Sequence, residues 1–163
     1  MHETHFLTLK RKLNSFFNST QIERALFFEA YLFLGLARAS VLILPFKLLS
    51  RHWGIPHSEG LYSTPKDREF LRQLSRAIHT ASRYTPWKSN CLPQALAAKH
   101  MLHRRSYTST LYLGISTANT SSTDAISAHA WLRCADTWIC GYRASQGFTV
   151  VATFSESQET VTG

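Results

Sequence analysis

The chain has 163 residues, of which 44% are hydrophobic and 17% are charged. This balance excludes a disordered chain, and the length is sufficient for one hydrophobic core, so we expect a single domain over residues 1–163. The formal net charge of +8 would suit an acidic partner. The basic residues are nevertheless dispersed and no nucleic-acid recognition motif accompanies them, so we predict no nucleic-acid binding.

Three cysteines, Cys91, Cys134 and Cys140, occur without a CxxC spacing. They predict neither a disulfide framework nor a zinc site. Residues 1–12 are polar and basic, and no signal-peptide cleavage site follows them. We therefore expect a cytoplasmic protein with reduced thiols, no metal and no cofactor.

Residues 1–53 are predicted to form an N-terminal helical part. Apolar residues at helical spacing predict a short helix over residues 6–17. Thr20 and Glu23 have the spacing of a capping box, in which each side chain satisfies a free amide at the start of a second helix.

This second helix, which runs toward Pro45, is apolar on nearly all sides. Glu29 and Arg38 interrupt the apolar run, so a helix buried in the core is favoured over a membrane span. Attachment to a membrane surface, with Lys47 and Arg51 beside the apolar residues, remains an alternative.

A loop is predicted over residues 54–63, and it separates the helical part from a core over residues 64–154. Thr64 and Pro65 are typical of the start of a helix, which Pro86 would prevent from continuing. Residues 155–163 are polar and are expected to form a fraying tail.

The core is predicted to place helices before strands. A helix is expected from Cys91 to about His103, and residues rich in β-branched and aromatic side chains then predict four strands. The predicted strands are 110–115, 128–134, 137–142 and 148–154. This segregated order predicts an α+β fold with a small antiparallel sheet.

Cys91 is the first candidate for chemistry. Ser89 or Asn90 is a suitable N-cap, which places Cys91 in the first helical turn, and Pro93 is tolerated there. Free amides and the helix dipole favour a thiolate at this position. The same amides, with Asn90 or Ser89 as a side-chain donor, could hold the oxyanion of a tetrahedral intermediate. A lone cysteine is more commonly a small buried residue, so this segment alone does not decide between the two interpretations.

His129 is the second candidate, because it lies on a predicted strand between Ala128 and Ala130, which leave space for a thiol and a substrate. It could equally be a hydrogen-bonded core residue. A cysteine at a helix N-terminus and a histidine on a strand are nevertheless the nucleophile and base of many thiol enzymes. We therefore predict that Cys91 and His129 form a catalytic pair.

Several motifs in order resemble the leader peptidase of lasso peptide biosynthesis, and more specifically the stand-alone protease half of a split B protein. The resemblance covers most of residues 20–154. Its main motifs are Trp87 with Asn90-Cys91-Leu92, Gln94-Ala95-Leu96-Ala97, Leu111-Tyr112-Leu113-Gly114, Ala128-His129-Ala130-Trp131-Leu132-Arg133-Cys134 and Phe148-Thr149-Val150-Val151-Ala152.

The resemblance implies a papain-like or transglutaminase-like core, with a nucleophile-bearing helix and N-terminal helices packed on it. It also implies a cysteine protease that removes the leader from a ribosomally made precursor. A separate lasso cyclase would then act on the freed core peptide. Because residues 1–80 lack the strand-rich pattern of a leader-recognition domain, we expect a separate recognition protein to act in trans.

The third catalytic residue is not identified. The family often has an Asp twelve residues after the histidine, and Gly141 occupies that position here. A hairpin turn at Asp136 would bring residues 140–142 opposite His129 and leave Asp136 at the far end. Glu29 is more simply explained by a buried salt bridge. A backbone carbonyl or a water could orient His129 instead.

The alternative function is a non-catalytic scaffold or peptide-binding subunit of a membrane-associated peptide-maturation complex, which the missing acid at Gly141 favours. Trp87 and Trp131 could line a cleft for an extended peptide, although such aromatic residues are more often packed in a core. Cys134 and Cys140 are predicted to be buried strand residues.

Overall fold

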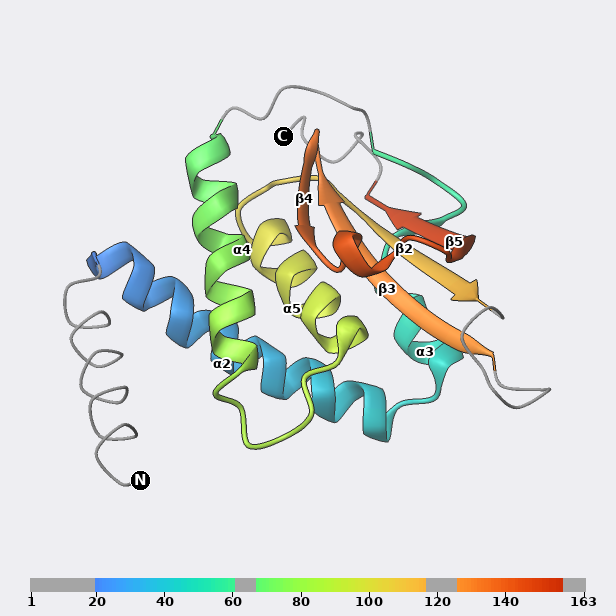
Figure 1. The fold of residues 1–163 in the computed structure, drawn as a ribbon, viewed down its shortest axis with the longest axis horizontal. Coiled ribbons are helices and arrows are strands. Elements are labelled where there is room, and N and C mark those ends of the chain that lie inside the picture. Colours follow the sequence, from blue (N-terminus) through green and yellow to red (C-terminus); the bar gives the residue numbers. More distant parts are fainter. Residues whose placement is uncertain (1–19, 61–66, 117–125, 157–163) are drawn as a thin grey trace.

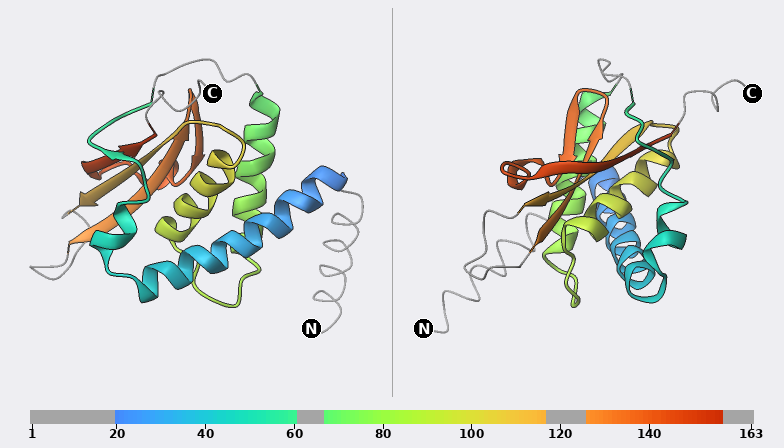
Figure 2. Two further views of the ribbon diagram at one scale, coloured as in Figure 1. Left: turned by 180° about the vertical axis from the view of Figure 1, so that it is seen from behind. Right: turned by 90° about the vertical axis from the view of Figure 1, so that its right-hand side faces the viewer.

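The structure is a computed structural model that describes residues 20–60, 67–116 and 126–156. Helices pack on one face of a five-stranded antiparallel sheet (Figures 1 and 2). The helices are α2 (Gln21–Ile43), α3 (Phe46–Ser50), α4 (Arg68–Ser82) and α5 (Cys91–His103). The strands are β1 (Ile55–Pro56), β2 (Ser109–Ser116), β3 (Ser127–Cys134), β4 (Thr137–Cys140) and β5 (Thr149–Ser155), with the 3-10 turn η1 (Tyr142–Ala144) before β5. The predicted α+β class is confirmed, whereas the predicted helix over residues 6–17 lies outside the described residues.

Helix α2 begins at the predicted capping box, in which the Thr20 hydroxyl accepts from the Glu23 amide and the Glu23 carboxylate accepts from the Thr20 amide. One stripe of the helix is buried against α4 and α5, and it consists of Leu26, Ala30, Leu34 and Ala37. The opposite stripe exposes large apolar side chains such as Leu32, which is 59% exposed. The prediction of a helix buried on all sides is therefore wrong, because the described elements cover only one side of α2.

Helix α4 begins later than predicted, at Arg68, because Asp67 is its N-cap and its carboxylate accepts from the Phe70 amide. Thr64 and Pro65 lie outside the described residues. The helix ends at Ser82, before Pro86. Its apolar face is buried and consists of Leu71, Leu74, Ala77, Ile78 and Ala81.

The strands form the order β1-β5-β2-β3-β4. The central pair, β2 and β3, is in register along its whole length, from Ser109 opposite Cys134 to Ser116 opposite Ser127. Strand β1 was missed, since Ile55 and Pro56 lie in the predicted loop and pair with the end of β5. β5 reaches Ser155 and the Glu156 carboxylate pairs with Lys99, so the first residues of the expected tail are part of the fold.

The two faces of the sheet differ in what covers them. Ala130 and Leu132 join the apolar core beneath the helices. The alternating residues of β3, namely His129, Trp131 and Arg133, therefore point to the other face. There Trp131 stacks on Tyr112 with ring centroids 5.8 Å apart, and the Arg133 guanidinium donates to the Tyr112 hydroxyl at 2.9 Å.

Candidate active site

Cys91 is the first residue of α5, as the sequence predicted. Its N-cap, Asn90, has an extended backbone and makes no capping hydrogen bond with its side chain. The amides of Cys91 and Leu92 have no partner within the helix, because the first turn of any α-helix leaves its amides free. The thiol is half-buried. Cys91 therefore lies beside free donors at the positive end of a helix dipole.

The loop that leads into α5 is held by side-chain hydrogen bonds. The Thr85 and Ser89 hydroxyls lie 2.8 Å apart, and the Thr85 hydroxyl also donates to the Trp87 carbonyl. The side-chain amide of Gln94, which lies in the first turns of α5, donates to the Ser89 carbonyl at 2.7 Å. Ser89 is engaged in these contacts, which leaves the exposed Asn90 as the freer side-chain donor beside Cys91.

The His129 imidazole is oriented by a backbone group. Its Nε2 lies 2.8 Å from the Gly141 carbonyl oxygen. A carbonyl can only accept a hydrogen bond, so Nε2 carries the proton and Nδ1 of the neutral ring is the basic nitrogen. Trp131 stacks on the ring at 5.8 Å and Phe148 lies 5.2 Å from it, so aromatic packing also restrains its position.

Gly141 cannot carry the missing acid in this conformation. Its φ is +80°, a region that residues with a side chain rarely adopt. A Cβ built at Gly141 would lie 2.4 Å from the Ala130 carbonyl oxygen and 2.8 Å from the Trp131 Cβ. The prediction that residues 140–142 approach His129 is confirmed at Gly141, but the group that reaches the ring is a main-chain carbonyl.

The other residues considered as third member are engaged elsewhere. Tyr142 stacks on Trp138 with centroids 4.1 Å apart, and Asp136 forms an ion pair with Arg68. The Glu29 carboxylate lies 2.6 Å from Arg105 and 3.1 Å from Arg104, which follow the C-terminal end of α5. The salt bridge predicted for Glu29 is present, but it is partly exposed and not buried, since the Arg104 side chain is 54% exposed.

Cys91 and His129 lie near the same short segment of chain without bonding to each other. Cys91 begins α5 on the helix-covered side of the sheet, whereas the His129 side chain points to the opposite face. The Cys140 thiol faces the core and lies close enough to Cys91 for an electrostatic interaction. The next residue, Gly141, binds His129. Within the described part of the chain no hydrogen bond joins Cys91 to His129, although such bonds are often long in a free enzyme and tighten on substrate binding.

The three thiols lie in different environments. Burial raises the pKa of Cys134 to about 11 and that of Cys140 to about 12. Both are buried strand residues, as predicted, and at neutral pH both remain protonated and unreactive. Cys91 is the half-buried thiol at a helix start, so the structure separates it from the two core cysteines.

The tryptophans near these motifs are packed. Trp87 contacts Tyr31 and Gly35 of α2, and its indole Nε1 is buried without a hydrogen-bond partner among the described residues. Trp131 is 4% exposed and lies between Tyr112 and His129. Trp131 contributes to the position of the imidazole.

Comparison with known proteins identifies the family. No curated protein and no solved structure matches the chain significantly. Residues 42–153, more than half of the chain, match the model of the Transglutaminase-like superfamily, whose members are typically cysteine peptidases or transglutaminases. The matched region contains both Cys91 and His129. The chain therefore belongs to the transglutaminase-like superfamily.

Proposed function

We propose that this protein is a cysteine peptidase in which Cys91 is the nucleophile and His129 the general base. The observation that carries the proposal is the hydrogen bond from His129 Nε2 to the Gly141 carbonyl. It leaves Nδ1 as the ring nitrogen that can accept a proton from a thiol.

In the proposed reaction, His129 Nδ1 takes the proton of the Cys91 thiol and the thiolate attacks the carbonyl carbon of the scissile peptide bond. The Cys91 amide and the Asn90 side chain donate to the oxyanion. The imidazolium then protonates the leaving amine, which departs and leaves an acyl-enzyme. A water, deprotonated by His129, attacks the thioester and releases the acyl portion as a carboxylic acid together with the thiol.

We further propose that the substrate is a lasso peptide precursor and that the departing amine is the amino terminus of the core peptide. The ordered motifs shared with lasso leader peptidases support this specificity. Among the described residues before α4, the regular elements are helices α2 and α3 and the two-residue strand β1, an arrangement unlike a strand-rich leader-recognition domain. We propose that a separate recognition protein presents the leader and that a lasso cyclase uses the released amine.

The test is cleavage of a lasso precursor peptide, followed by mass spectrometry, with and without a leader-recognition protein. The expected products are an intact leader and an intact core. The Cys91→Ala and His129→Ala variants should give neither product. Cleavage at an unchanged rate by Cys91→Ala would refute the mechanism, whereas cleavage of unrelated peptides with equal efficiency would refute the substrate.

A non-catalytic scaffold or peptide-binding subunit is the second candidate, favoured by the absence of a bond between Cys91 and His129 within the described residues. The rate of alkylation by iodoacetamide near neutral pH distinguishes the two functions. An activated Cys91 should react faster than glutathione and lose this advantage in His129→Ala. A Cys91 that reacts like glutathione in both proteins would favour the scaffold.

A further inference from the structure

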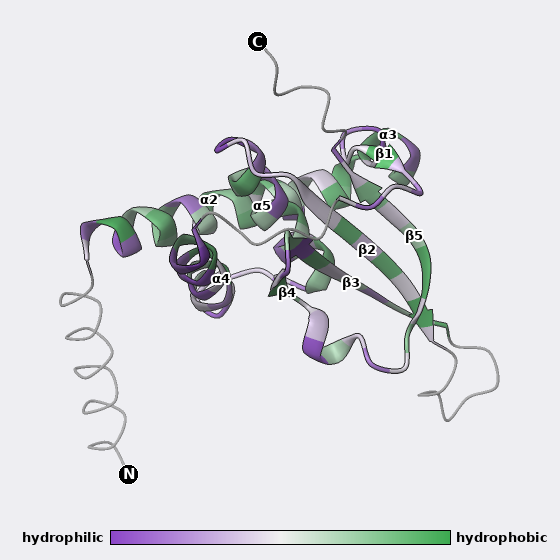
Figure 3. Ribbon diagram, turned by 90° about the horizontal axis from the view of Figure 1, so that it is seen from above, coloured by the Kyte–Doolittle hydropathy of each residue, from purple (hydrophilic) through white to green (hydrophobic). Residues whose placement is uncertain are grey.

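An exposed apolar surface runs along α2 and continues onto α3. We call the following side chains the α2–α3 surface: Leu32, Leu36, Leu42, Ile43, Leu44, Phe46 and Leu48, each at least 42% exposed. Figure 3 shows apolar residues along the length of α2. A helix of 23 residues is about 35 Å long. Apolar surfaces of this extent mark sites of interaction with a partner or a membrane.

The segment that carries most of the α2–α3 surface is basic. Between Glu29 and Glu59 the chain has no acidic residue, whereas it has Arg38, Lys47 and Arg51. An apolar helix face bordered by basic side chains is typical of proteins that lie on anionic lipid bilayers.

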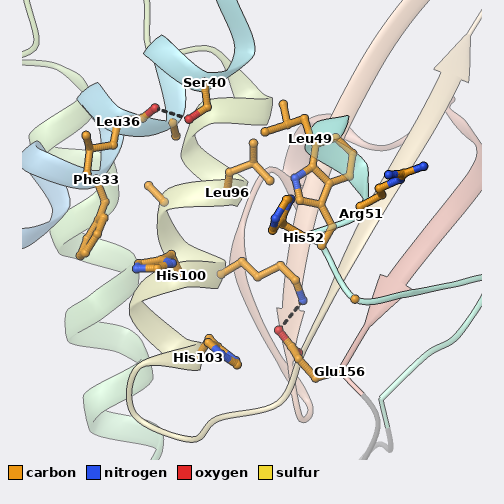
Figure 4. Close-up of a pocket in the computed structure, with 15 residues that line it drawn as sticks. Phe33, Leu36, Ser40, Leu49, Arg51, His52, Leu96, His100, His103 and Glu156 are labelled. Atoms are coloured by element: carbon orange, nitrogen blue, oxygen red, sulfur yellow. Dashed lines mark hydrogen bonds and ion pairs between the residues drawn. The ribbon is translucent and has the colours of Figure 1, made fainter. Parts of the chain in front are cut away.

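A cavity of about 520 Å³ opens beside this surface, between α2, α3 and α5 (Figure 4). Phe33, Leu36 and Leu49 contribute an apolar wall, and Arg51, His52, Lys99, His100 and His103 form much of the rest. Lys99 is paired with Glu156 at 2.7 Å, and burial lowers the pKa of His100. Among the described lining residues, Arg51 is the permanent cation without an ion pair, and it continues the basic border of the apolar surface into the recess.

Helix α2 is long and apolar enough to span a bilayer, but its packing favours a position on the surface of the bilayer. Leu26, Ala30, Leu34 and Ala37 are buried against the rest of the domain. Glu29, in the same helix, binds Arg104 and Arg105. Insertion across a membrane would remove α2 from these contacts and expose the core, whereas lying on the surface leaves them intact.

A second copy of the chain fits this surface less well. A twofold dimer through α2 would bring the basic borders of two identical surfaces together, and no acidic residue lies between Glu29 and Glu59 to compensate them. We therefore propose that the α2–α3 surface docks the protein on an anionic phospholipid membrane, with α2 parallel to the bilayer. This inference is independent of the peptidase reaction.

Flotation of the full chain with vesicles tests the proposal. We expect the chain to float with vesicles of phosphatidylcholine mixed with phosphatidylglycerol and much less with phosphatidylcholine alone. Lys47→Gln and Arg51→Gln should each weaken binding to the anionic vesicles about fivefold. The double substitution Leu32→Glu with Leu42→Glu should weaken it more than about tenfold, because it places carboxylates in the bilayer interface.

The control is Val151→Glu, which introduces one of the same carboxylates at an exposed apolar residue of β5 outside the α2–α3 surface. It should bind vesicles almost like the unaltered chain, and circular dichroism establishes that each variant is folded. Equal binding to both kinds of vesicle, or equal loss in Val151→Glu and the double variant, overturns the proposal. If alkaline carbonate fails to release the bound protein from the vesicles, α2 spans the bilayer. If light scattering shows a dimer that the double variant abolishes, the surface binds a second copy of the chain. Either result also overturns the proposal.

Discussion

The two ends of α5 are built differently. At its C-terminal end, Glu29 of α2 binds Arg104 and Arg105, and the Arg105 guanidinium also donates to the Met101 carbonyl. At its N-terminal end the described residues show no ion pair, and Cys91 lies half-buried beside helical amides that are free for a ligand. About 20 Å of helix separates the two ends.

The C-terminal end of α5 therefore stabilises the domain, whereas its N-terminal end is the part available for a reaction. Ion pairs attach α2 to the C-terminal end of α5 and contribute to holding the helices together. The other end presents a half-buried thiol beside the free amides that a helix start leaves. This combination is what distinguishes it from the paired end.

The largest effect should come from exchanging one thiol. Cys91→Ala is expected to lower precursor cleavage by more than about a thousandfold and to change the free energy of unfolding by less than about 0.5 kcal/mol. Cys140→Ala should do the reverse, with cleavage retained and a loss of about 1 kcal/mol from the core. Cleavage rates and urea denaturation of both variants measure this contrast. Similar cleavage rates in the two variants would remove the functional distinction between the thiols.

A second prediction concerns the backbone that holds His129. Gly141→Ala should lower the free energy of unfolding by about 3 kcal/mol or more. A Cβ at this position clashes with the Ala130 carbonyl, and the positive φ adds backbone strain. Gly147→Ala is the matched control, since its φ is +85° but nothing lies within 4 Å of its Cβ. It should cost only about 1–2 kcal/mol. Urea denaturation provides both values.

The same site predicts that Gly141→Asp does not restore a conventional triad. The carboxylate would require a Cβ in space that Ala130 and Trp131 occupy. We expect lower cleavage and lower stability than in the unaltered protein. Faster cleavage by Gly141→Asp would show that the backbone adapts and that a carboxylate orients His129 better than the carbonyl does.

The third prediction uses the buried thiols. The folded state raises the pKa of Cys140 from 9.0 to about 12 and that of Cys134 from 9.0 to about 11, whereas the unfolded chain ionises near 9.0. The stability from these protonated thiols is complete below pH 9.0 and is lost as the pH rises toward 11–12, by up to about 1.4 kcal/mol per pH unit for each thiol.

Unfolding in urea at pH values on both sides of 9.0 measures this loss. The free energy of unfolding of Cys140→Ala should decrease more gently with rising pH, because one of the two thiols no longer titrates. All other titrating groups are common to both proteins, so the difference in slope isolates Cys140. Identical slopes would contradict the burial of this thiol.

The smallest effect is expected at the paired end of α5. Glu29→Gln should lower the free energy of unfolding by about 1–2 kcal/mol, since the partly exposed Arg104 and Arg105 lose a charged partner. Cleavage should be unchanged, because the ion pairs lie at the opposite end of α5 from Cys91. A large loss of cleavage with unchanged stability would contradict the division between the two ends.

Much of the candidate site follows from local sequence. The position of Cys91 at the start of α5 could be predicted because an N-cap and a tolerated proline act within one helical turn. The strand around His129 could be predicted from its β-forming side chains. The start of α2 followed from the reciprocal hydrogen bonds of Thr20 and Glu23, which are three residues apart.

Only the tertiary structure decided what orients the imidazole. The pairing of β3 with β4 shifts between Leu132 and Arg133, and the chain then turns at Gly141 in a left-handed conformation. A bulge and a turn between strands determine which atom reaches His129, and neither has a distinctive local pattern in this sequence.

The composition of α2 also could not show which of its sides is exposed, because the sequence of an apolar helix is the same whether or not another element covers it. Composition thus identified the residues of α2 that avoid water, and the packing of α4 and α5 determined which of them are buried. Interactions within a few residues of each other were readable from the sequence. Those that join distant segments, such as Gly141 with His129 and α2 with α5, depend on the whole fold.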